Sequence, residues 1–363
     1  MTSNYLIPNT RTVLPPKEVY FDLIENIWNS RVITNNGVMV TALEKKLEER
    51  FSVKHALLVS NGTIALQLGI KALHLTGKIL TTPFSYIATL NSILWENCSP
   101  IFCDIDEDTF CVGIENLRKV VKNNEISGIL LTNVFGNPGS IDYIVKFAKD
   151  NNLKIIFDSS HCFDVEFNDH SIFNFGDVST LSLHATKIFQ TGEGGAIFTN
   201  DDLIATRIKL LRNFGHAGPN HFSSIGINGK MSEIHAALGL ANLPNVTGHI
   251  QSRKSIVENY RNQINNCYRF QFFEQSVKQN YSYFPVIVKN EDTLLKIKEI
   301  MEINRIECRR YFYPSLNSVD FMSFNQPMPV SEDISSRVLC LPLYPEMTPI
   351  ENDKVINILN SIS

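Results

Sequence analysis

Short apolar runs alternate with amphipathic stretches from about residue 54 to residue 199, and this alternation constrains the fold more than any other feature. Apolar runs of about four to eight residues are typical of buried strands, whereas apolar residues recurring every three or four positions are typical of helices. Strands separated by helices predict βαβ units and a mostly parallel sheet covered on both faces. The predicted strands span residues 55–59, 78–82, 100–104, 128–135, 153–158, 178–184 and 194–199, with helices at 63–75, 114–124 and 141–151.

The pattern changes near residue 246. Just before it, the glycine-containing stretch 215–229 predicts a long surface loop, and a helix at 231–243 follows. We expect two domains: a large α/β domain with an N-terminal arm over residues 1–245, and a small α+β domain over residues 246–363. The elements predicted in the small domain are helices at 251–265, 293–304 and 349–362 and strands at 283–288 and 306–312.

Composition excludes several classes of function. A formal net charge of −4 in 363 residues argues against a nucleic-acid-binding surface. No stretch approaches the ~18 apolar residues of a membrane span, and the first residues lack the pattern of a signal peptide. The seven cysteines form no CxxC pair, so we expect buried thiols in a reducing compartment and neither disulfides nor a metal site. These features predict a cytoplasmic protein.

Lys187 is the first candidate for chemistry. It follows the predicted strand at 178–184 and precedes the turn Gly192-Glu193-Gly194-Gly195. A lysine in such a position can be desolvated and partly neutral, and a neutral amine can attack an aldehyde to form a Schiff base. Most lysines are solvated surface charges, so this interpretation depends on whether other residues could hold an aldehyde cofactor.

A candidate phosphate site lies at Ser60-Asn61-Gly62-Thr63, between a predicted strand and a predicted helix. Free backbone N–H groups and the positive end of the helix dipole favour an anion there, and Thr63 adds a hydroxyl. The alternative is an ordinary helix N-cap.

Asp158 ends another predicted strand. The carboxyl ends of parallel strands line the ligand crevice of an open sheet, and a carboxylate there can keep a pyridine nitrogen protonated. Asp158 could instead cap the following turn. His161 could reach the same site or be structural, and Tyr86, after a further strand, could stack on a planar cofactor or pack in the core.

These groups are the ones a protein needs to hold pyridoxal 5′-phosphate: a phosphate cradle, a stacking ring, a carboxylate for the ring nitrogen and an amine. Ordered motifs across nearly the whole chain also resemble the DegT/DnrJ/EryC1/StrS family of sugar aminotransferases. The H-A-T-K…G-E-G-G and N-G-K-M-S-E runs are the most specific. The matching stretches are residues 34–37, 59–63, 102–106, 135–138, 184–187, 192–195, 212–215 and 228–233.

The resemblance implies a fold-type I pyridoxal-phosphate-dependent transferase with a mostly parallel central sheet, flanking helices and a smaller C-terminal α+β domain. It implies that Lys187 binds the cofactor aldehyde, that Asp158 pairs with the pyridine nitrogen, and that His161 lies near the phenolic oxygen. Family members with histidine at the lysine position are sugar 3-dehydratases, so the lysine here implies transamination.

The resemblance also assigns the remaining cofactor contacts. Tyr86 would stack on the ring, and Gly62, Thr63 and Ser182 would hold the phosphate. Asn228 would reach the phosphate bound in the neighbouring subunit, because family members are homodimers with shared active sites.

The implied substrates are a nucleotide-linked keto sugar and L-glutamate. Residues 81–86, 311–317 and 331–334 are similar to those of enzymes that convert dTDP-4-keto-6-deoxyglucose into dTDP-4-amino-4,6-dideoxyglucose. The chain departs from the common pattern at Asp158-Ser159-Ser160-His161, where relatives carry Asp-Ala-Ala-His, and at Gly139, where many carry cysteine. Amination at C3, a GDP or UDP sugar, and the downstream pathway (O-antigen or an antibiotic sugar) stay open.

Three residues are candidates for substrate contacts. Lys230 and Arg212 could bind the diphosphate of the nucleotide, although Arg212 could equally pair within the protein. Tyr313 could contact the sugar or pack between the domains.

Two further functions are alternatives. A non-catalytic nucleotide-sugar-binding or regulatory protein of the same fold would be expected to lose Lys187 or Asp158, and both are present. A nucleotide-sugar oxidoreductase would be expected to carry G-x-G-x-x-G after its first strand, where residues 60–63 offer one glycine.

Overall fold

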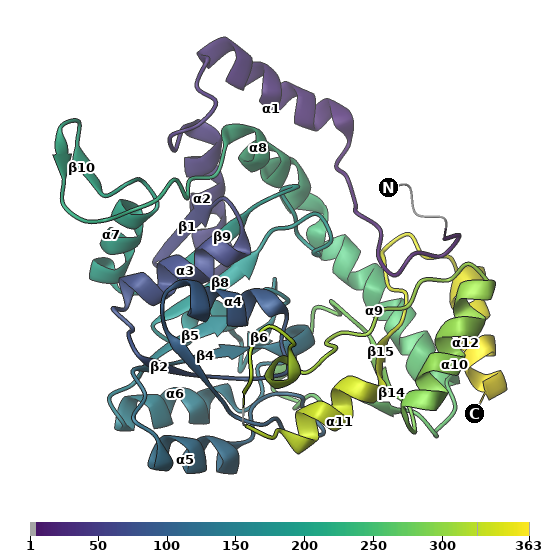
Figure 1. Cartoon of the computed structure of the whole chain (residues 1–363). Coiled ribbons are helices and arrows are strands. Elements are labelled where there is room, and N and C mark those ends of the chain that lie inside the picture. Colours follow the sequence, from purple (N-terminus) through teal and green to yellow (C-terminus); the bar gives the residue numbers. More distant parts are fainter. Residues whose placement is uncertain (1–4, 325, 363) are drawn as a thin grey trace.

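The computed structural model describes residues 5–324 and 326–362. A seven-stranded sheet lies at the centre of the larger part of the chain (Figure 1). Its strand order is β1-β9-β8-β5-β4-β2-β3, and only β9 runs against the others, which confirms the mostly parallel sheet. The strands are β1 (His55–Val59), β2 (Lys78–Thr81), β3 (Ser99–Phe102), β4 (Gly128–Thr132), β5 (Lys154–Asp158), β8 (Val178–Ser182) and β9 (Gly195–Thr199).

Helices cover both faces of this sheet because successive strand residues point to opposite sides. Leu57 of β1 packs in one apolar cluster with α3 (Gly62–Ala72) and α7 (Asp202–Leu211), and its neighbour Leu58 packs on the other face. The helices of that second face are α2 (Val38–Phe51) and α8 (Glu233–Asn242) beside β1, and α5 (Ile114–Asn123) and α6 (Ile141–Asp150) farther along. A further helix, α4 (Ile87–Trp95), packs beside α3.

Four strands end earlier than predicted, and two of them lie beside β5. The predicted strand 128–135 stops at Thr132, because the chain turns through the 3₁₀ helix η1 (Val134–Gly136), where Phe135 has φ of 57°. The predicted strand 178–184 stops at Ser182. As a result, polar residues at the carboxyl ends of β4, β5 and β8 lie side by side at one edge of the sheet.

The predicted loop at 215–229 contains a short hairpin, formed by β10 (His216–Gly218) and β11 (His221–Phe222). Gly215, with φ of 76°, starts it, and a Cβ atom there would lie 1.8 Å from the Ser224 carbonyl oxygen. Only glycine therefore allows this return of the chain, a close approach that the sequence pattern did not reveal.

The C-terminal part has its own three-stranded sheet, and it buries a separate apolar cluster that includes Tyr260, Leu294 and Val355. The predicted strand at 306–312 is wrong: Ile306 and Arg309 make only isolated bridges, because the chain turns and buries Phe312 against the large domain. The elements are α9 (Val246–Gln263), β12 (Arg269–Phe270), β14 (Pro285–Ile287), α10 (Glu291–Ile303), α11 (Pro329–Arg337), β15 (Val338–Cys340) and α12 (Pro349–Ile362).

We propose a domain boundary between residues 245 and 246, and this separate cluster supports it. The 3₁₀ helix η3 (Leu243–Asn245) leads directly into α9, which crosses from one part to the other in Figure 1. One C-terminal segment returns to the large domain, where β13 (Val277–Lys278) joins β6 (Glu166–Phe167) and β7 (His170–Ser171) in a small sheet.

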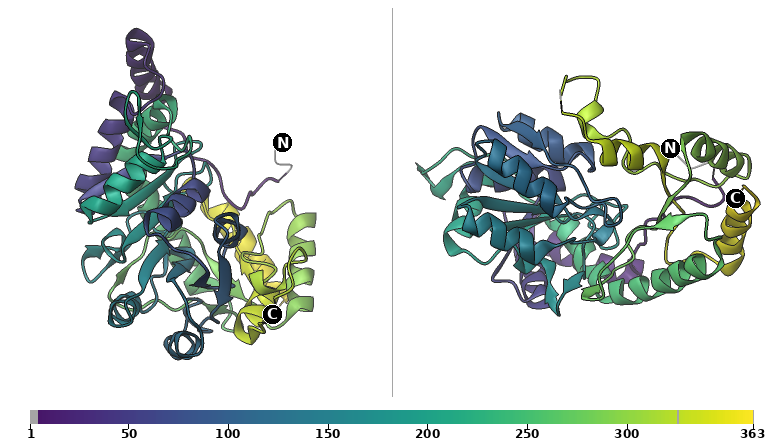
Figure 2. Two further views of the ribbon diagram at one scale, coloured as in Figure 1. Left: turned by 60° about the vertical axis from the view of Figure 1, so that its left-hand side comes forward. Right: turned by 90° about the horizontal axis from the view of Figure 1, so that it is seen from below.

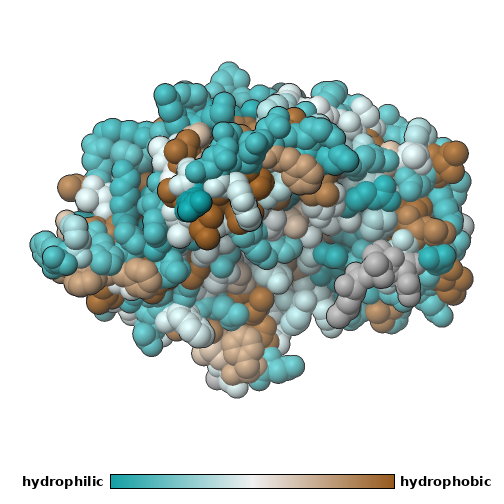
Figure 3. All heavy atoms as spheres, turned by 90° about the horizontal axis from the view of Figure 1, so that it is seen from above, coloured by the Kyte–Doolittle hydropathy of each residue, from teal (hydrophilic) through white to brown (hydrophobic). Residues whose placement is uncertain are grey.

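The N-terminal arm carries α1 (Lys17–Ser30), which projects from the rest of the molecule in Figures 1 and 2. Its Phe21 and Trp28 are exposed. Figure 3, a view from above onto this end of the molecule, shows hydrophobic patches among the hydrophilic side chains. Within the described ranges, no helix combines the length and apolarity needed to cross a bilayer.

Candidate active site

A cavity of about 530 Å³ lies where the carboxyl ends of the central strands face the C-terminal part of the chain. Seven residues predicted for the site line it, although they come from five separate stretches of sequence. These residues are Gly62, Thr63, Tyr86, Asp158, His161, Ser182 and Lys187. The cavity therefore gathers every predicted catalytic residue and all but one of the predicted cofactor contacts.

Lys187 follows β8 in a tight turn held by two backbone hydrogen bonds. The Lys187 N–H donates to the His184 carbonyl at 2.9 Å, and the Ala185 N–H donates to the Gly192 carbonyl at 2.8 Å. Lys187 is partly buried and lines the cavity. Burial lowers the pKa of Lys187 from its ordinary value, and the negative charge of Asp158 opposes that change. Lys187 therefore loses its proton more easily than a surface lysine does.

Asp158 is the last residue of β5 and is only 5% exposed. Its Oδ2 accepts a hydrogen bond from the Thr89 hydroxyl at 2.7 Å, and its Oδ1 accepts from the Ser160 hydroxyl at 2.5 Å. Donors on both oxygens suit an ionised carboxylate, which only accepts hydrogen bonds. The turn-capping alternative is also realised in part, since the Ser160 N–H donates to Oδ1 at 3.2 Å.

His161 is buried between aromatic rings. Its ring lies nearly parallel to that of Phe135, and the centroid of the Tyr283 ring is 4.6 Å away. Burial, reinforced by the positive charge of Lys187, holds the pKa of His161 well below its ordinary value. The Phe135 N–H donates to Nδ1 at 3.1 Å, so the single proton of the neutral ring resides on Nε2. His161 is therefore a neutral hydrogen-bond donor at Nε2.

The first turn of α3 lines the cavity. Asn61 caps the helix by accepting from the Ile64 N–H at 2.9 Å, and the first N–H groups of a helix have no partner within the helix. A Cβ on Gly62 would lie 3.1 Å from the Ser182 Cβ, so glycine lets the helix approach the end of β8 closely. The N-cap alternative and a phosphate cradle are thus compatible, and the Thr63 hydroxyl adds a donor.

These residues fit pyridoxal 5′-phosphate. The cavity brings together an anion site at one end, the Asp158 carboxylate at a strand end and a buried amine, and its volume can contain a small aromatic cofactor. Tyr86 lies at its edge and is 57% exposed, which leaves its ring free to cover a planar group.

Four other predicted residues lie outside the lining of this cavity. Arg212 is 3% exposed and donates to Glu44 at 2.6 Å and to the Leu58 carbonyl at 2.8 Å, so the intramolecular alternative holds and a diphosphate contact in this cavity is ruled out. Its guanidinium holds α2 against the first strand. Lys230 donates to the side chain of Asn213 at 3.0 Å.

The other two are Asn228 and Tyr313. Asn228 pairs with Asn213 through a backbone bridge at the base of the hairpin. Tyr313 is half exposed, and its ring packs 3.5 Å from the Arg310 guanidinium carbon. The structure thus brings together the predicted cofactor residues other than Asn228, but none of the predicted substrate residues.

The sequence did not indicate several of the lining residues, four of which belong to the C-terminal part. Arg309 places a cation at the cavity, held by Glu307 at 3.0 Å and by the Tyr311 hydroxyl at 2.8 Å. The run of arginine and aromatic residues at 309–313 is the sequence feature that could have indicated this side of the cavity. The other lining residues that were missed include Ser85, Thr132, Ser160, Tyr283, Tyr311 and Phe312.

Comparison with known proteins gives the same assignment. Residues 17–360 match the DegT/DnrJ/EryC1/StrS aminotransferase family. The chain is 35% identical over 362 residues to the dTDP-4-amino-4,6-dideoxy-D-glucose transaminase of Shigella dysenteriae, covering 97% of this chain and 98% of the relative. It is 28% identical over 351 residues to the GDP-perosamine synthase of Escherichia coli O157:H7, covering 96% and 94%.

A solved structure is similar over the same length. DesI, determined in the presence of its TDP-sugar product, superposes with a TM-score of 0.91 at 25% identity, covering 99% of this chain and 93% of DesI. The cavity, the motifs and these matches agree. The chain belongs to the DegT/DnrJ/EryC1/StrS aminotransferase family and is a pyridoxal-phosphate-dependent sugar aminotransferase.

Proposed function

We propose that the protein transfers the amino group of L-glutamate to the C4 carbonyl of dTDP-4-keto-6-deoxyglucose, giving dTDP-4-amino-4,6-dideoxyglucose and 2-oxoglutarate. The observation that carries the proposal is the buried Lys187 amine in one cavity with Asp158 and His161. The name of the Shigella relative supports the dTDP sugar. A GDP-linked 4-keto sugar is the second candidate, supported by the GDP-perosamine synthase match.

When bound, pyridoxal 5′-phosphate supplies an aldehyde that takes up the amino group and a ring that withdraws electrons from the reacting carbon. Lys187 would hold the aldehyde in the resting enzyme. Its Nζ would also take the proton from the α-carbon of the amino donor and later return a proton. The lowered pKa of Lys187 favours the neutral amine that this proton transfer requires.

The other cavity residues orient the cofactor. Asp158 holds a proton on the ring nitrogen, and His161 donates from Nε2 toward the phenolic oxygen. The first turn of α3, with Thr63 and Ser182, binds the phosphate. Each of these residues lines the cavity.

Arg309 is our candidate for the carboxylate of the amino donor. Its contacts with Glu307 and Tyr311 use Nε and Nη1, which fix the guanidinium beside the cavity. We expect Arg309→Met to raise the KM for glutamate about ten- to hundredfold, since hydrogen bonds to charged groups are worth about 1.5–3 kcal/mol. Arg310→Met is the matched control, because Arg310 pairs with Glu291 and Tyr313 instead. An unchanged KM for glutamate in Arg309→Met would show that Arg309 does not bind the carboxylate of the amino donor.

We further propose a homodimer with shared active sites, in which Asn228 contacts the phosphate bound by the second subunit. Its position outside the cavity of its own chain supports this, as do the exposed apolar residues of α1. Mixing Asn228→Ala and Lys187→Ala subunits should restore one intact site per mixed dimer. If the mixture stays as inactive as its parents, the sites are not shared.

The substrate is tested by incubation of the enzyme and glutamate with a panel of nucleotide-linked 4-keto and 3-keto sugars. Mass spectrometry and NMR identify the product. We expect amination at C4 with the dTDP sugar turned over fastest and with ping-pong kinetics, since both half-reactions share one covalent carrier. Preferential turnover of a GDP sugar, or amination at C3, would contradict the assignment.

A further inference from the structure

A chain of three buried hydroxyl groups ends on Asp158. The Ser85 hydroxyl lies 2.7 Å from that of Thr132 and 2.8 Å from that of Thr89, and Thr89 lies 2.7 Å from Asp158 Oδ2. Thr89 is wholly buried, and Ser85 and Thr132 are nearly so. The three residues come from the start of α4, the turn before it and the end of β4.

The direction of every hydrogen bond in this chain follows from the number of protons. A hydroxyl carries one proton, and an ionised carboxylate carries none. Thr89 therefore donates to Asp158 and must accept from Ser85, and Ser85 in turn must accept from Thr132. All three dipoles thus point their positive ends toward the carboxylate, and hydrogen bonds aligned in this way strengthen one another.

The second oxygen of Asp158 is held from the opposite side. Oδ1 accepts from the Ser160 hydroxyl at 2.5 Å and from its N–H at 3.2 Å. The Ser160 hydroxyl and N–H thus give Oδ1 two donors from a single residue. Rotation of a carboxylate about its last bond has only broad preferences, and donors on both oxygens fix its plane.

We propose that Thr89 and Ser160 are positioning residues, whose hydroxyls hold the Asp158 carboxylate oriented toward the cofactor's ring nitrogen. The inference rests on the proposed role of Asp158. Without Thr89, Oδ2 loses its donor in a buried place, and the carboxylate turns to find another partner. This rotation weakens its contact with the ring nitrogen without removing the carboxylate.

Thr89→Val tests this inference, because it removes the hydroxyl and keeps the shape of the side chain. We expect kcat to fall about ten- to hundredfold, the range for a hydrogen bond to a charged group. The absorbance spectrum of the bound cofactor should change, and the cofactor should dissociate faster. Thr89→Ser, which restores the donor, should recover most of the rate and the wild-type spectrum.

Ser160→Ala and Ser85→Ala extend the series. Ser160→Ala should lower kcat and change the spectrum in the same way, and Ser85→Ala, one bond farther from the carboxylate, should have the smaller effect. Ser92→Ala is the matched control: Ser92 is a buried hydroxyl on the same helix that donates to the Ala88 carbonyl, and its loss should leave rate and spectrum unchanged.

Asp158→Asn, measured in parallel, separates the role of Asp158 itself from the positioning role of Thr89 and Ser160. If Asp158→Asn is slow while Thr89→Val and Ser160→Ala match the wild type in rate, spectrum and cofactor release, the positioning role is overturned and that of Asp158 stands. If Asp158→Asn is itself as fast as the wild type, the role of Asp158 falls and the positioning role with it. Should Thr89→Val fail to fold, Ser160→Ala decides alone.

Discussion

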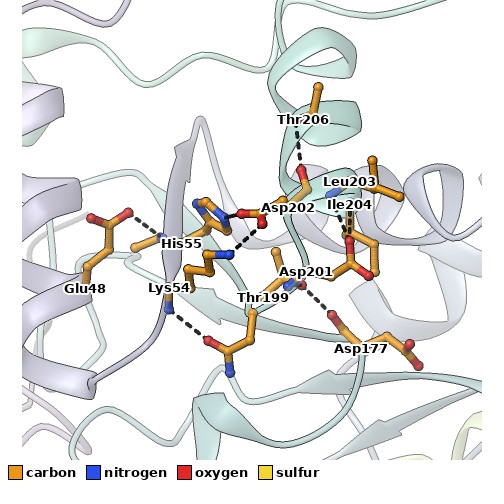
Figure 4. A network of polar contacts seen from close by, with 12 residues as sticks. Glu48, Lys54, His55, Asp177, Thr199, Asp201, Asp202, Leu203, Ile204 and Thr206 are labelled. Atoms are coloured by element: carbon orange, nitrogen blue, oxygen red, sulfur yellow. Dashed lines mark hydrogen bonds and ion pairs between the residues drawn. The ribbon is translucent and has the colours of Figure 1, made fainter.

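Two polar networks lie at opposite edges of the central sheet. At the amino ends of β1 and β8, Asp202 binds Lys54 at 2.5 Å and His55 at 2.8 Å, and neighbouring contacts join Thr199 to Asp177 (Figure 4). At the carboxyl ends of β4 and β5 lies the network of Asp158. The first carries more charges, and its aspartate side chain is 64% exposed. The second consists mainly of hydroxyls, and its aspartate is almost wholly buried.

The difference shows how burial, more than the number of charges, decides what a polar network does. Water and salt screen the charges around Asp202, so these pairs serve mainly to attach α7 to the sheet. Around Asp158 there is little water to replace a lost partner, so each donor constrains the carboxylate strongly. The same residue type therefore has a structural task at one edge and, in the role proposed for Asp158, a chemical task at the other.

The largest effect should come from Lys187→Ala. Because the amine holds the cofactor and moves the proton, we expect turnover to fall by about 10⁴-fold or more. The absorbance of covalently bound cofactor should disappear as well. Lys45→Ala, at an exposed lysine of α2, is the control and should behave as the wild type. Retained turnover in Lys187→Ala would refute the assignment of the cavity.

Asp158→Asn and Asp202→Asn compare the two edges directly. We expect Asp158→Asn to bind cofactor but lose on the order of 10²-fold or more in kcat, since the amide cannot hold the ring proton as a carboxylate does. Asp202→Asn should keep the wild-type kcat. Equal losses in the two variants would contradict the division between the edges.

The pH dependence of stability tests the burial of His161. Its pKa is lowered in the folded state, so below about pH 6.5 the unfolded chain binds a proton that the folded chain does not. The contribution of the neutral His161 ring to the free energy of unfolding is therefore present above that pH. It is lost as the pH falls, by up to about 1.4 kcal/mol for each pH unit. Urea unfolding of the cofactor-free protein from pH 7 to pH 5 measures it. His161→Asn should flatten the curve, and His74→Asn, at an exposed position, should not.

The smallest effect should come from the exposed ion pair between Lys54 and Asp202. The hydrogen bond from Lys54 lowers the pKa of Asp202, so this pair stabilises the fold at neutral pH and weakens as acid protonates the carboxylate. Because the pair is exposed, Lys54→Met should change the melting temperature little, and added salt should abolish even that change. A large loss of stability that persists in salt would show that the exposure of an ion pair does not decide how much it contributes to stability.

Much of the cofactor site could be predicted because its residues are tied to local patterns. Asp158 and Ser182 end apolar strands, and Gly62 begins a helix after a strand, so a parallel sheet brings them to one edge. The substrate side could not be predicted in this way. Arg212 and Arg309 are both arginines near family motifs, yet one is enclosed by Glu44 and the other faces the cavity.

The sequence by itself determined the sheet, the position of Lys187 after a strand and the chemistry that a buried amine near a carboxylate can perform. Tertiary structure decided which distant side chains meet them: Thr89 from a neighbouring helix and Arg309 from the C-terminal part. The physical reason is that hydrophobic periodicity fixes which face of an element is buried, whereas the partner on that face depends on how whole elements pack together.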